Sequence, residues 1–197
     1  MPKIVNRDHR REQLAEAAWR VIRREGMEGV SVRSVAEEAG MSLGSLRHYF
    51  ATQSELLSFS MRLVTERVRK RIVSSRRSGD PRVDIESLIG EMIPLDPERL
   101  AECEVWLAFV GSTPAHPELR SLCEEVHDAL YGFFRSIVDS LLALKLVKSG
   151  VDAELEAMRL HALVDGLVVH GVSRSPKATP AEIMRIVSYH LDSIMTQ

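Results

Sequence analysis

The 197-residue chain is long enough for one or two domains, and its 45% hydrophobic and 27% charged residues are typical of a globular protein. Residues 1–80, here called the front, carry 16 Lys and Arg and 10 Asp and Glu. Residues 81–197, the rear, carry 10 Lys and Arg and 18 Asp and Glu. Only the basic front therefore suits a polyanionic partner. No apolar run approaches the roughly 20 residues that cross a bilayer and no secretory signal is present, which excludes a membrane protein and favours a cytoplasmic one.

The first predicted helix has an apolar face that starts at Leu14 and recurs every three or four residues until Gly26 stops it. Ser31 then caps a short helix over residues 32–39, and Gly40 ends it. Later apolar patterns also repeat at three or four residues, with no alternating strand. The sequence therefore predicts an all-α fold of about nine helices.

The stretch AEEAGMSLGSLRHYF, from Ala36 to Phe50, indicates two short helices separated by a turn of only three or four residues. Helices joined so tightly must cross steeply, and Gly40 stands where the chain needs a left-handed turn. The apolar residues expected where the helices meet are Val35, Ala39, Met41, Leu46 and Tyr49. These are the steric requirements of a helix-turn-helix, whose second helix enters the major groove of DNA. The alternative is an ordinary helical hairpin within a bundle.

A long helix is predicted after this turn. Thr52 and Glu55 have the spacing of a capping box, in which Thr52 accepts from the backbone N–H of Glu55 and Glu55 reaches back. The helix is expected to run to about Arg77. Proline and glycine separate five further predicted helices, over residues 82–93, 97–113, 117–145, 152–172 and 179–195.

Through SVRSVAEEAGMSLGSLRHYFATQSELL the sequence closely resembles the TetR family of transcriptional regulators, over residues 9–57. The segments WLAFVGSTPAHPELR and ALVDGL resemble the C-terminal domain of the BetI-like subgroup. The resemblance implies a three-helix DNA-binding domain over residues 1–53 and a ligand-binding and dimerisation domain over residues 54–197. It further implies a homodimeric repressor, not an enzyme, that binds a double-stranded DNA operator and responds to a small-molecule effector.

In this resemblance the recognition helix spans residues 43–50. The residues carried over as DNA contacts are Arg33, Ser42, Leu43, Gly44, Ser45, Arg47, His48, Tyr49, Thr52 and Gln53. Gly44 lets the backbone approach closely, and Tyr49 donates to a phosphate while its ring packs inward. Arg33 grips a phosphate, and Thr52–Gln53 place the N-terminus of the next helix against the DNA backbone.

Two positions depart from the family's pattern. Arg47 stands where the family often has Tyr, and Gln53 stands where it often has Lys. Loss of the Lys weakens the electrostatic grip, whereas Arg47 restores a charge that reaches either a phosphate or a guanine. Both roles of Arg47 stay open.

The resemblance also implies an effector pocket in the rear domain, where aromatic residues lie on two predicted helices. The candidate pocket residues are Met61, Met92, Trp106, Phe109, Val110, His127, Tyr131 and Phe134. The Met side chains are included because they adapt their shape to gaps. Core packing is the alternative for each residue, because aromatic and Met stripes at helical spacing usually pack inside.

The last two long helices have wide apolar faces, which two subunits would bury as a four-helix bundle. The predicted interface residues are Leu160, Val164, Leu167, Val168, Val187, Leu191 and Ile194. Gly166 costs about 1 kcal/mol relative to Ala within a helix, so close helix approach is its predicted reason. The alternative is that these faces pack only within one subunit.

Other polar residues of the rear domain are given structural interpretations. Asp165 is expected to be a buried acid that bonds across the dimer or caps another helix, with a ligand role as the alternative. His161 and His170 are expected to be hydrogen-bonded core or interface residues. No histidine spacing suits a metal site, and no cofactor is expected. Cys103 and Cys123, which form no CxxC, are interpreted as small hydrophobes in a reducing compartment, with a redox switch as the alternative.

Two other functions are weighed against the regulator. An all-α small-molecule-binding protein or enzyme would use the rear cavity, yet no nucleophile elbow, phosphate loop or paired metal ligands are found in the sequence. An interaction protein would keep the helix-turn-helix without binding DNA. The basic front argues against this last reading, although basic faces also occur on solvated helices.

Overall fold

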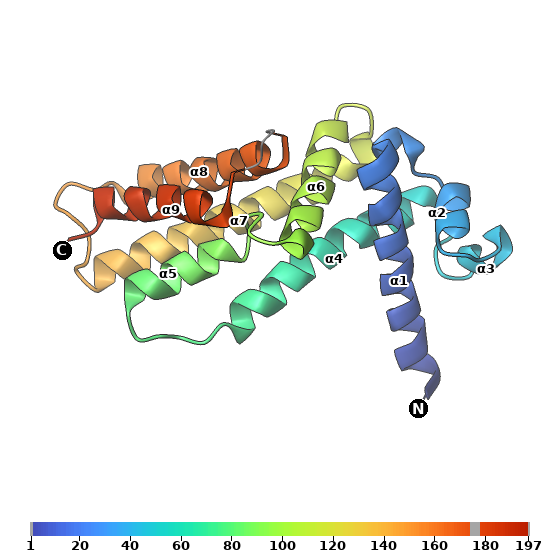
Figure 1. The fold of residues 1–197 in the computed structure, drawn as a ribbon, viewed down its shortest axis with the longest axis horizontal. Coiled ribbons are helices and arrows are strands. Elements are labelled where there is room, and N and C mark those ends of the chain that lie inside the picture. Colours follow the sequence, from blue (N-terminus) through green and yellow to red (C-terminus); the bar gives the residue numbers. More distant parts are fainter. Residues whose placement is uncertain (1, 174–177, 197) are drawn as a thin grey trace. The chain divides into compact units, whose positions relative to one another are not determined.

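The structure, a computed structural model, describes residues 2–173 and 178–196, with side chains from Arg7 onward, and its regular elements are helices (Figure 1). They are α1 (Pro2–Glu25), the 3-10 helix η1 (Met27–Gly29), α2 (Val32–Glu38), α3 (Leu43–Arg47), α4 (Gln53–Ser74), α5 (Pro81–Gly90), α6 (Pro97–Ser112), α7 (Pro117–Ala143), α8 (Ala153–Ser173) and α9 (Pro180–Ile194). The prediction of an all-α fold is confirmed. No helix in the described part of the chain is long and apolar enough to cross a membrane.

The chain divides into two compact units. Unit 1 comprises Met1–Arg67 and Glu104–Cys123, and unit 2 comprises Val68–Cys103 and Glu124–Gln197. The borders fall inside α4, α6 and α7, so each of these helices contributes a segment to both units. The units are therefore not continuous in the chain, and the predicted domain division after residue 53 stays a prediction.

The core of unit 1 is built on the apolar face of α1, along which Leu14, Ala18 and Val21 are buried. This face packs against α2, and α2 packs against α3. The α4 helix joins them through Trp19, whose indole N–H donates to the carbonyl oxygen of Ser60 at 3.1 Å. The Arg67 guanidinium lies 4.9 Å from the centre of the Trp19 ring, within the range of a cation–π contact.

The helix boundaries differ from the predicted ones mainly at four ends, one of which is that of α5, at Gly90 and not at residue 93. The α1 helix begins at Pro2, well before Leu14, because its first turns carry no apolar face that would reveal them in the sequence. The α3 helix ends at Arg47 and not at Phe50, since the N–H groups of His48 and Tyr49 bond three residues back. The α4 helix ends at Ser74 and not at about Arg77.

In unit 2, Arg71 ties the end of α4 to α5 and α6. Its guanidinium donates to both carboxylate oxygens of Glu102, at 2.6 and 3.0 Å, and to Oε2 of Glu91 at 2.9 Å. The Glu102 residue is only 3% exposed. The bidentate geometry therefore neutralises a carboxylate that burial would otherwise penalise strongly.

The α5 helix packs against α9, where Arg82 donates to the carbonyl oxygen of Ser188 at 2.9 Å and pairs with Asp192. The backbone approaches another segment most closely at Gly171, where an added Cβ would overlap the ring of Pro94. At Gly166 an added Cβ would meet no atom within 4 Å. The close approach predicted for Gly166 therefore does not occur among the residues that the structure describes.

Candidate nucleic-acid interface

The turn between α2 and α3 is fixed by one glycine and two serines. Gly40 has φ 64°, in the left-handed region that side-chain-bearing residues rarely adopt. The N–H of Met41 then bonds back to the carbonyl oxygen of Ala36 at 2.9 Å, which closes the end of α2. Ser42 caps α3, because its Oγ accepts from the N–H of Ser45 at 3.1 Å.

The inner side of α3 anchors this short helix to the rest of unit 1. Leu46 and Phe50 are fully buried, as is Val35 of α2. The Phe50 ring lies 5.3 Å from that of Phe59, and the Arg11 guanidinium lies 4.6 Å from both ring centres. Among the apolar residues predicted to join the two helices, Val35 and Leu46 are buried, while the half-buried members are Ala39, Met41 and Tyr49.

The outer side of α3 is exposed. Its exposed residues are Ser42, Leu43, Gly44, Ser45, Arg47 and His48. Ser42 and Ser45 are linked through their hydroxyl oxygens at 2.9 Å. By contrast, the side chains of Arg47 and His48 make no hydrogen bond or ion pair with the part of the chain that the structure describes. The unpaired side chains of Arg47 and His48 on the outer side of α3 can therefore donate hydrogen bonds to a polar partner outside the chain.

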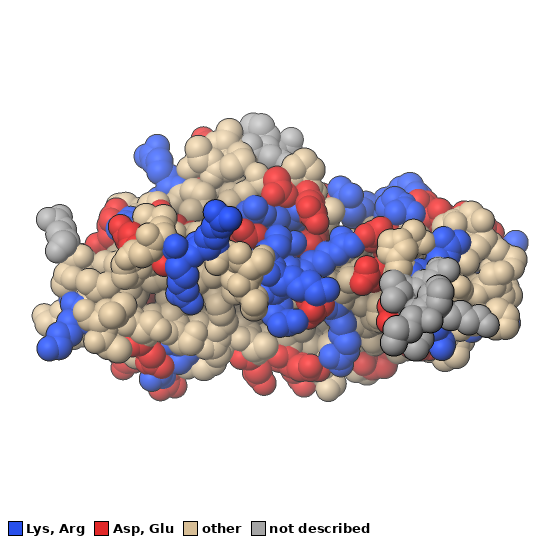
Figure 2. Space-filling view, turned by 90° about the horizontal axis from the view of Figure 1, so that it is seen from below, with Lys and Arg blue, Asp and Glu red and all other residues tan. Residues whose placement is uncertain are grey.

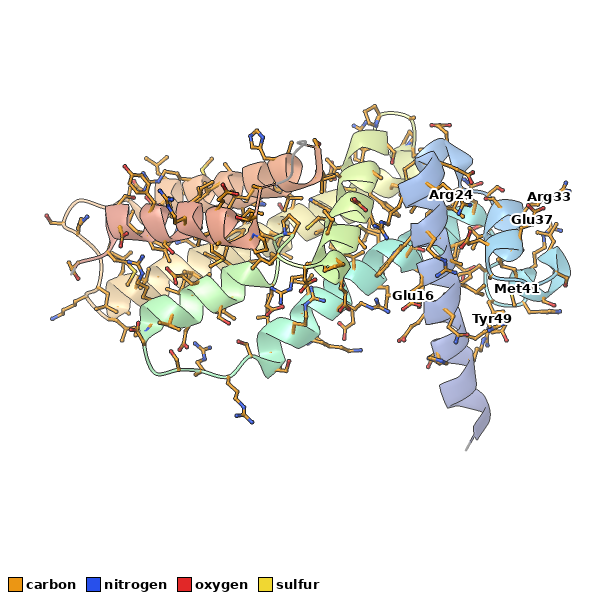
Figure 3. All side chains as sticks on the ribbon, viewed as in Figure 1. Glu16, Arg24, Arg33, Glu37, Met41 and Tyr49 are labelled. Atoms are coloured by element: carbon orange, nitrogen blue, oxygen red, sulfur yellow. The ribbon has the colours of Figure 1, made fainter. Side chains whose placement is uncertain are left out.

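Arg33 stands at the start of α2 and is the predicted phosphate contact there. Figure 3 shows it with Glu37 on the side of α2 turned away from α1. Its Nε donates to Oε1 of Glu37 at 3.1 Å, and the two side chains are 82% and 69% exposed. An ion pair so exposed holds weakly, so a phosphate can compete with Glu37 for the guanidinium.

The N-terminus of α4 is the second element that could face a phosphate. Thr52 Oγ1 accepts from the N–H of Glu55 at 3.0 Å, and Glu55 reaches back to the N–H of Ala51 at 2.9 Å. The Gln53 side chain is held inside unit 1, where its amide donates to the carbonyl oxygen of Val30 at 2.7 Å. The group that Gln53 leaves for an external anion is its backbone N–H, beside that of Ser54, because helix geometry gives neither an acceptor.

Other basic residues of unit 1 are engaged within the chain. Arg20 and Arg24 of α1 donate to the two oxygens of Glu38 at 2.6 and 2.9 Å. These bonds, that from Arg20 first, hold the pKa of the Glu38 carboxyl below its ordinary value, so it stays ionised and fixes the end of α2 to α1. Arg20 and Arg24 are therefore held by Glu38, whereas Arg47 of α3 has no partner in the described part of the chain.

The eight predicted pocket residues are divided between the two units. Met61, Trp106, Phe109 and Val110 belong to unit 1, and Met92, His127, Tyr131 and Phe134 belong to unit 2. Met61, Phe109 and Phe134 are fully buried, whereas Val110 and His127 are exposed. Unit 2 contains a cavity of about 390 Å³ that none of these eight residues lines. Their role in ligand binding stays a prediction.

The seven predicted interface residues on α8 and α9 all lie inside unit 2. Each of them is 6% exposed or less, so their side chains pack within the chain, and their part in an interface stays a prediction. The exposed apolar residues of the same two helices are Leu155, Met158, Val169, Ile186 and Tyr189. The predicted interface set did not include them, because periodicity does not separate the two apolar sides of α8.

Two histidines of unit 2 are buried beside carboxylates. His161 stacks 4.7 Å from His127, and its Nε2 lies 3.6 Å from Oδ2 of Asp165. Burial lowers the pKa of His161 and raises that of Asp165. His190 lies 3.0 Å from Glu156, and burial likewise lowers its pKa. His161 thus lies in the core, as expected, while the hydrogen bond expected for it stays a prediction, since the 3.6 Å contact is longer than one.

Two interpretations of this region need correction. Asp165 was expected to be buried, yet its side chain is 46% exposed, so it is only half-buried. His170 is exposed, which excludes the core part of its interpretation, and its place in an interface stays a prediction. Cys103 is buried and Cys123 is half-buried, as small hydrophobes would be. No group of three or more His, Cys, Asp or Glu side chains in the described ranges could hold a metal ion.

Two family models match the sequence. Residues 14–58 match the model for bacterial regulatory proteins of the tetR family. Residues 81–196 match the model for the C-terminal part of BetI-type transcriptional repressors. The first match contains α2, α3 and the turn between them, and the second contains most of unit 2.

Similar proteins span nearly the whole chain. The HTH-type transcriptional regulator PksA of Bacillus subtilis (strain 168) is 40% identical over 100% of this chain and 95% of its own. The HTH-type transcriptional regulator BetI of Proteus mirabilis (strain HI4320) is 28% identical over 98% and 94%.

Solved structures share the fold. A transcriptional regulator from Rhodococcus sp. Rha1 has a TM-score of 0.80 at 27% identity, over 93% of this chain and 95% of that one. A transcriptional regulator from Saccharomonospora viridis, solved in complex with choline, has a TM-score of 0.81 at 21% identity, over 96% and 100%.

Proposed function

Because this chain belongs to the TetR family of bacterial regulatory proteins, with a BetI-type C-terminal domain, we propose that it binds a palindromic operator as a homodimer and releases it when a small effector binds. The chain is a transcriptional regulator with a helix-turn-helix, and repression agrees with the BetI-type model that it matches. We assign residues 1–53 to DNA binding and residues 54–197 to effector binding and dimerisation. The proposal places it in the cytoplasm, where bacterial operators lie, and gives it no enzymatic activity.

The outer face of α3 is the observation that carries the DNA-binding part of this proposal. A core of Leu46 and Phe50 holds the helix rigidly, while Arg47 and His48 project from it with no partner in the described chain. Rigid placement matters because a side chain reads a base edge only when its donors are already oriented. The amides at the start of α4 and the guanidinium of Arg33 would then bind phosphates on either side.

The exposed apolar residues of α8 and α9 support the homodimer. The two helices are joined in unit 2 by Arg159, which donates to Oγ of Ser193 at 3.2 Å. Leu155 and Met158 on α8 are 65% and 54% exposed, and Tyr189 on α9 is 78% exposed. A monomer would leave this apolar surface in water, whereas two copies related by a twofold axis would bury it in a four-helix bundle.

The α4 helix offers a route from effector to operator. It begins at the amides proposed to contact a phosphate, and at its far end Ile72 and Val73 line the cavity of unit 2. A ligand in that cavity changes operator affinity only if it binds one position of α4 better than another. Choline is the ligand in the Saccharomonospora viridis structure, which shares the fold of this chain.

Selection of bound sequences from a pool of random duplex DNA tests this proposal. We expect recovery of a palindrome whose half-sites are centred about one helical turn, or a small multiple of it, apart. The purified chain should bind this site more tightly than a scrambled duplex at the same salt concentration. Recovery of no common sequence, or equal affinity for the two duplexes, would overturn the DNA-binding part.

A further inference from the structure

The cavity of unit 2 has a volume of about 390 Å³, within the range of sites that hold small organic ligands. It lies between the end of α4, the loop over residues 75–80, α5 and the second half of α7. Every residue that lines it belongs to unit 2. It is therefore a site within one compact unit.

One wall of the cavity is apolar. Ile85 of α5 and Ile137 and Leu141 of α7 line it, and all three are buried. The hydroxyl groups on the same wall are already used, because Ser136 donates to the carbonyl oxygen of Phe133 and Ser140 to that of Ser136, both at 2.7 Å. This wall suits the hydrocarbon part of a ligand and offers no polar hydrogen to its charged part.

The charged residues of the lining are Arg76, Arg77 and Asp84. Asp84 accepts from the N–H and the hydroxyl of Ser78 at 2.6 and 2.8 Å. These bonds, with the nearby charge of Arg77, lower the pKa of the Asp84 carboxyl, so it stays ionised and is already satisfied. Arg77 is partly balanced by Asp84, while Arg76 has no partner in the described part of the chain. The lining therefore keeps one positive charge in excess.

The bias rests on the lining itself, because Arg71 of α4, near the cavity, is paired with Glu91 and Glu102. Figure 2 shows Lys and Arg side chains gathered along α4 on the face that it displays. Phe133 is the one aromatic residue among those that line the cavity, and a quaternary ammonium is usually held by several aromatic rings. The site thus differs in charge and in aromatic content from one built for a cation.

We infer that this cavity binds a small amphiphilic anion, with its apolar part against α5 and α7 and its single carboxylate or phosphate held by Arg76 and Arg77. The inference rests on the proposed function, because it names the chemical class of the effector. The guanidinium groups supply paired donors that match a carboxylate or a phosphate. An anion of this kind cancels the excess positive charge, whereas a cation of the same length would add to it.

Three eight-carbon probes test the charge preference by titration calorimetry: octanoate, octanol and octyltrimethylammonium. We expect octanoate to bind the full-length chain at least about tenfold more tightly than the ammonium probe, with octanol between them. The double variant Arg76→Ala/Arg77→Ala should lose about tenfold in octanoate affinity and little in octanol affinity. Arg120→Ala, which removes an exposed arginine from α7 in unit 1, is the matched control and should bind as the wild type does.

A second variant locates the site. Ser140→Phe fills the cavity from its rim with a larger side chain, so it should abolish binding of octanoate and octanol while thermal unfolding shows a folded protein. Equal affinity for octanoate and the ammonium probe, or octanoate binding unchanged in the arginine double variant, would overturn the inference. Absence of octanoate binding would overturn it as well.

Operator affinity, measured by fluorescence anisotropy with and without octanoate, separates this inference from the proposed function. Octanoate binding that depends on Arg76 and Arg77 but leaves operator affinity unchanged supports the site and contradicts release by its ligand. Operator binding without any octanoate binding contradicts the site and leaves the DNA-binding function standing.

Discussion

Gly40 and Gly44 are separated by three residues and serve opposite needs. Gly40 adopts φ 64° at the end of α2, where a Cβ costs an L-residue roughly 1–2 kcal/mol. Gly44 lies inside α3, where an added Cβ would meet only Oγ of Ser42, at 3.9 Å. Gly40 allows the backbone conformation of the turn. Gly44 has no side chain, so a DNA backbone can come close to the outer face of α3.

Gly40→Ala is therefore expected to lower the free energy of unfolding by about 1 kcal/mol, because the turn must keep a strained backbone. Gly44→Ala is the matched control and should raise that free energy by up to about 1 kcal/mol, since Ala favours a helix interior. Urea denaturation measures both. The methyl group that Gly44→Ala adds should also weaken operator binding. Equal free energies of unfolding for the two variants would contradict the roles assigned to Gly40 and Gly44.

Arg47 is the residue on which sequence specificity depends in this account. Arg47→Ala should weaken operator binding by ~1–3 kcal/mol if the guanidinium makes a bidentate contact with guanine, and a mutated half-site should then lose little more. If Arg47 instead binds a phosphate, all duplexes should lose affinity together, with a shallower salt dependence. Gel-shift titrations on matched and mutated operators distinguish the two, with Arg120→Ala as a charge-matched control. Unchanged affinity in Arg47→Ala would rule out both roles.

At the scale of helices, the turn, caps and apolar faces follow from the sequence because they depend on local geometry. Gly40, Ser42 and Thr52 occupy the positions that their side chains or lack of one require. The early start of α1 at Pro2 and the short α3 could not be predicted in the same way. A helix that extends without an apolar face gives no periodic signal, and the end of α3 depends on where Leu46 and Phe50 meet the core.

The contact between α7 and α8 makes stability depend on pH. His161 stacks on His127 and Phe134 and faces Asp165, and burial lowers its pKa below the ordinary value. The folded chain thus binds fewer protons at His161 than the unfolded chain, so the free energy of unfolding falls as the pH falls through the ordinary histidine pKa. Asp165 acts in the opposite direction, because its pKa is raised.

We expect the urea midpoint of the wild type to fall between about pH 7.5 and pH 5.5, and His161→Phe to remove much of that fall. Phe is chosen because it keeps the ring that packs against Phe134 without a proton to bind. His190, whose pKa is also lowered, accounts for part of the remaining fall. His48→Ala, at an exposed position on the other unit, is the control. A midpoint that falls equally in wild type and His161→Phe would contradict the assignment.

For the whole molecule, the sequence predicts which helices are rich in apolar residues, but it does not predict which of those residues are exposed on the surface. The core of unit 2 contains Leu160, Val164 and Leu191. The same two helices carry Leu155, Met158 and Tyr189 on their exposed sides. Periodicity cannot separate these sets when a helix is apolar on two sides. The pocket shows the same limit, since Arg76 and Ile137 are far apart in the chain and only the fold brings them to one cavity.

The proposed homodimer buries the exposed apolar residues of α8 and α9, among them Leu155, Met158 and Tyr189. The wild type should have twice the 22.1 kDa mass of one chain in light scattering, and Tyr189→Glu should shift it toward a single chain by placing a charge in the buried bundle. Val83→Glu changes an exposed valine on α5 and should leave the dimer intact. A monomeric wild type, or a Tyr189→Glu variant that stays dimeric, would contradict this interface.

The claim that the outer face of α3 enters the major groove is tested most directly by guanine N7 methylation interference on the selected operator, because N7 lies in that groove. We predict two clusters of interfering guanines on one face of the duplex, centred about one helical turn or a small multiple of it apart, and loss of part of each cluster with Arg47→Ala. Binding that tolerates methylation of every guanine, or interference at positions that fall on opposite faces of the duplex, would contradict the account.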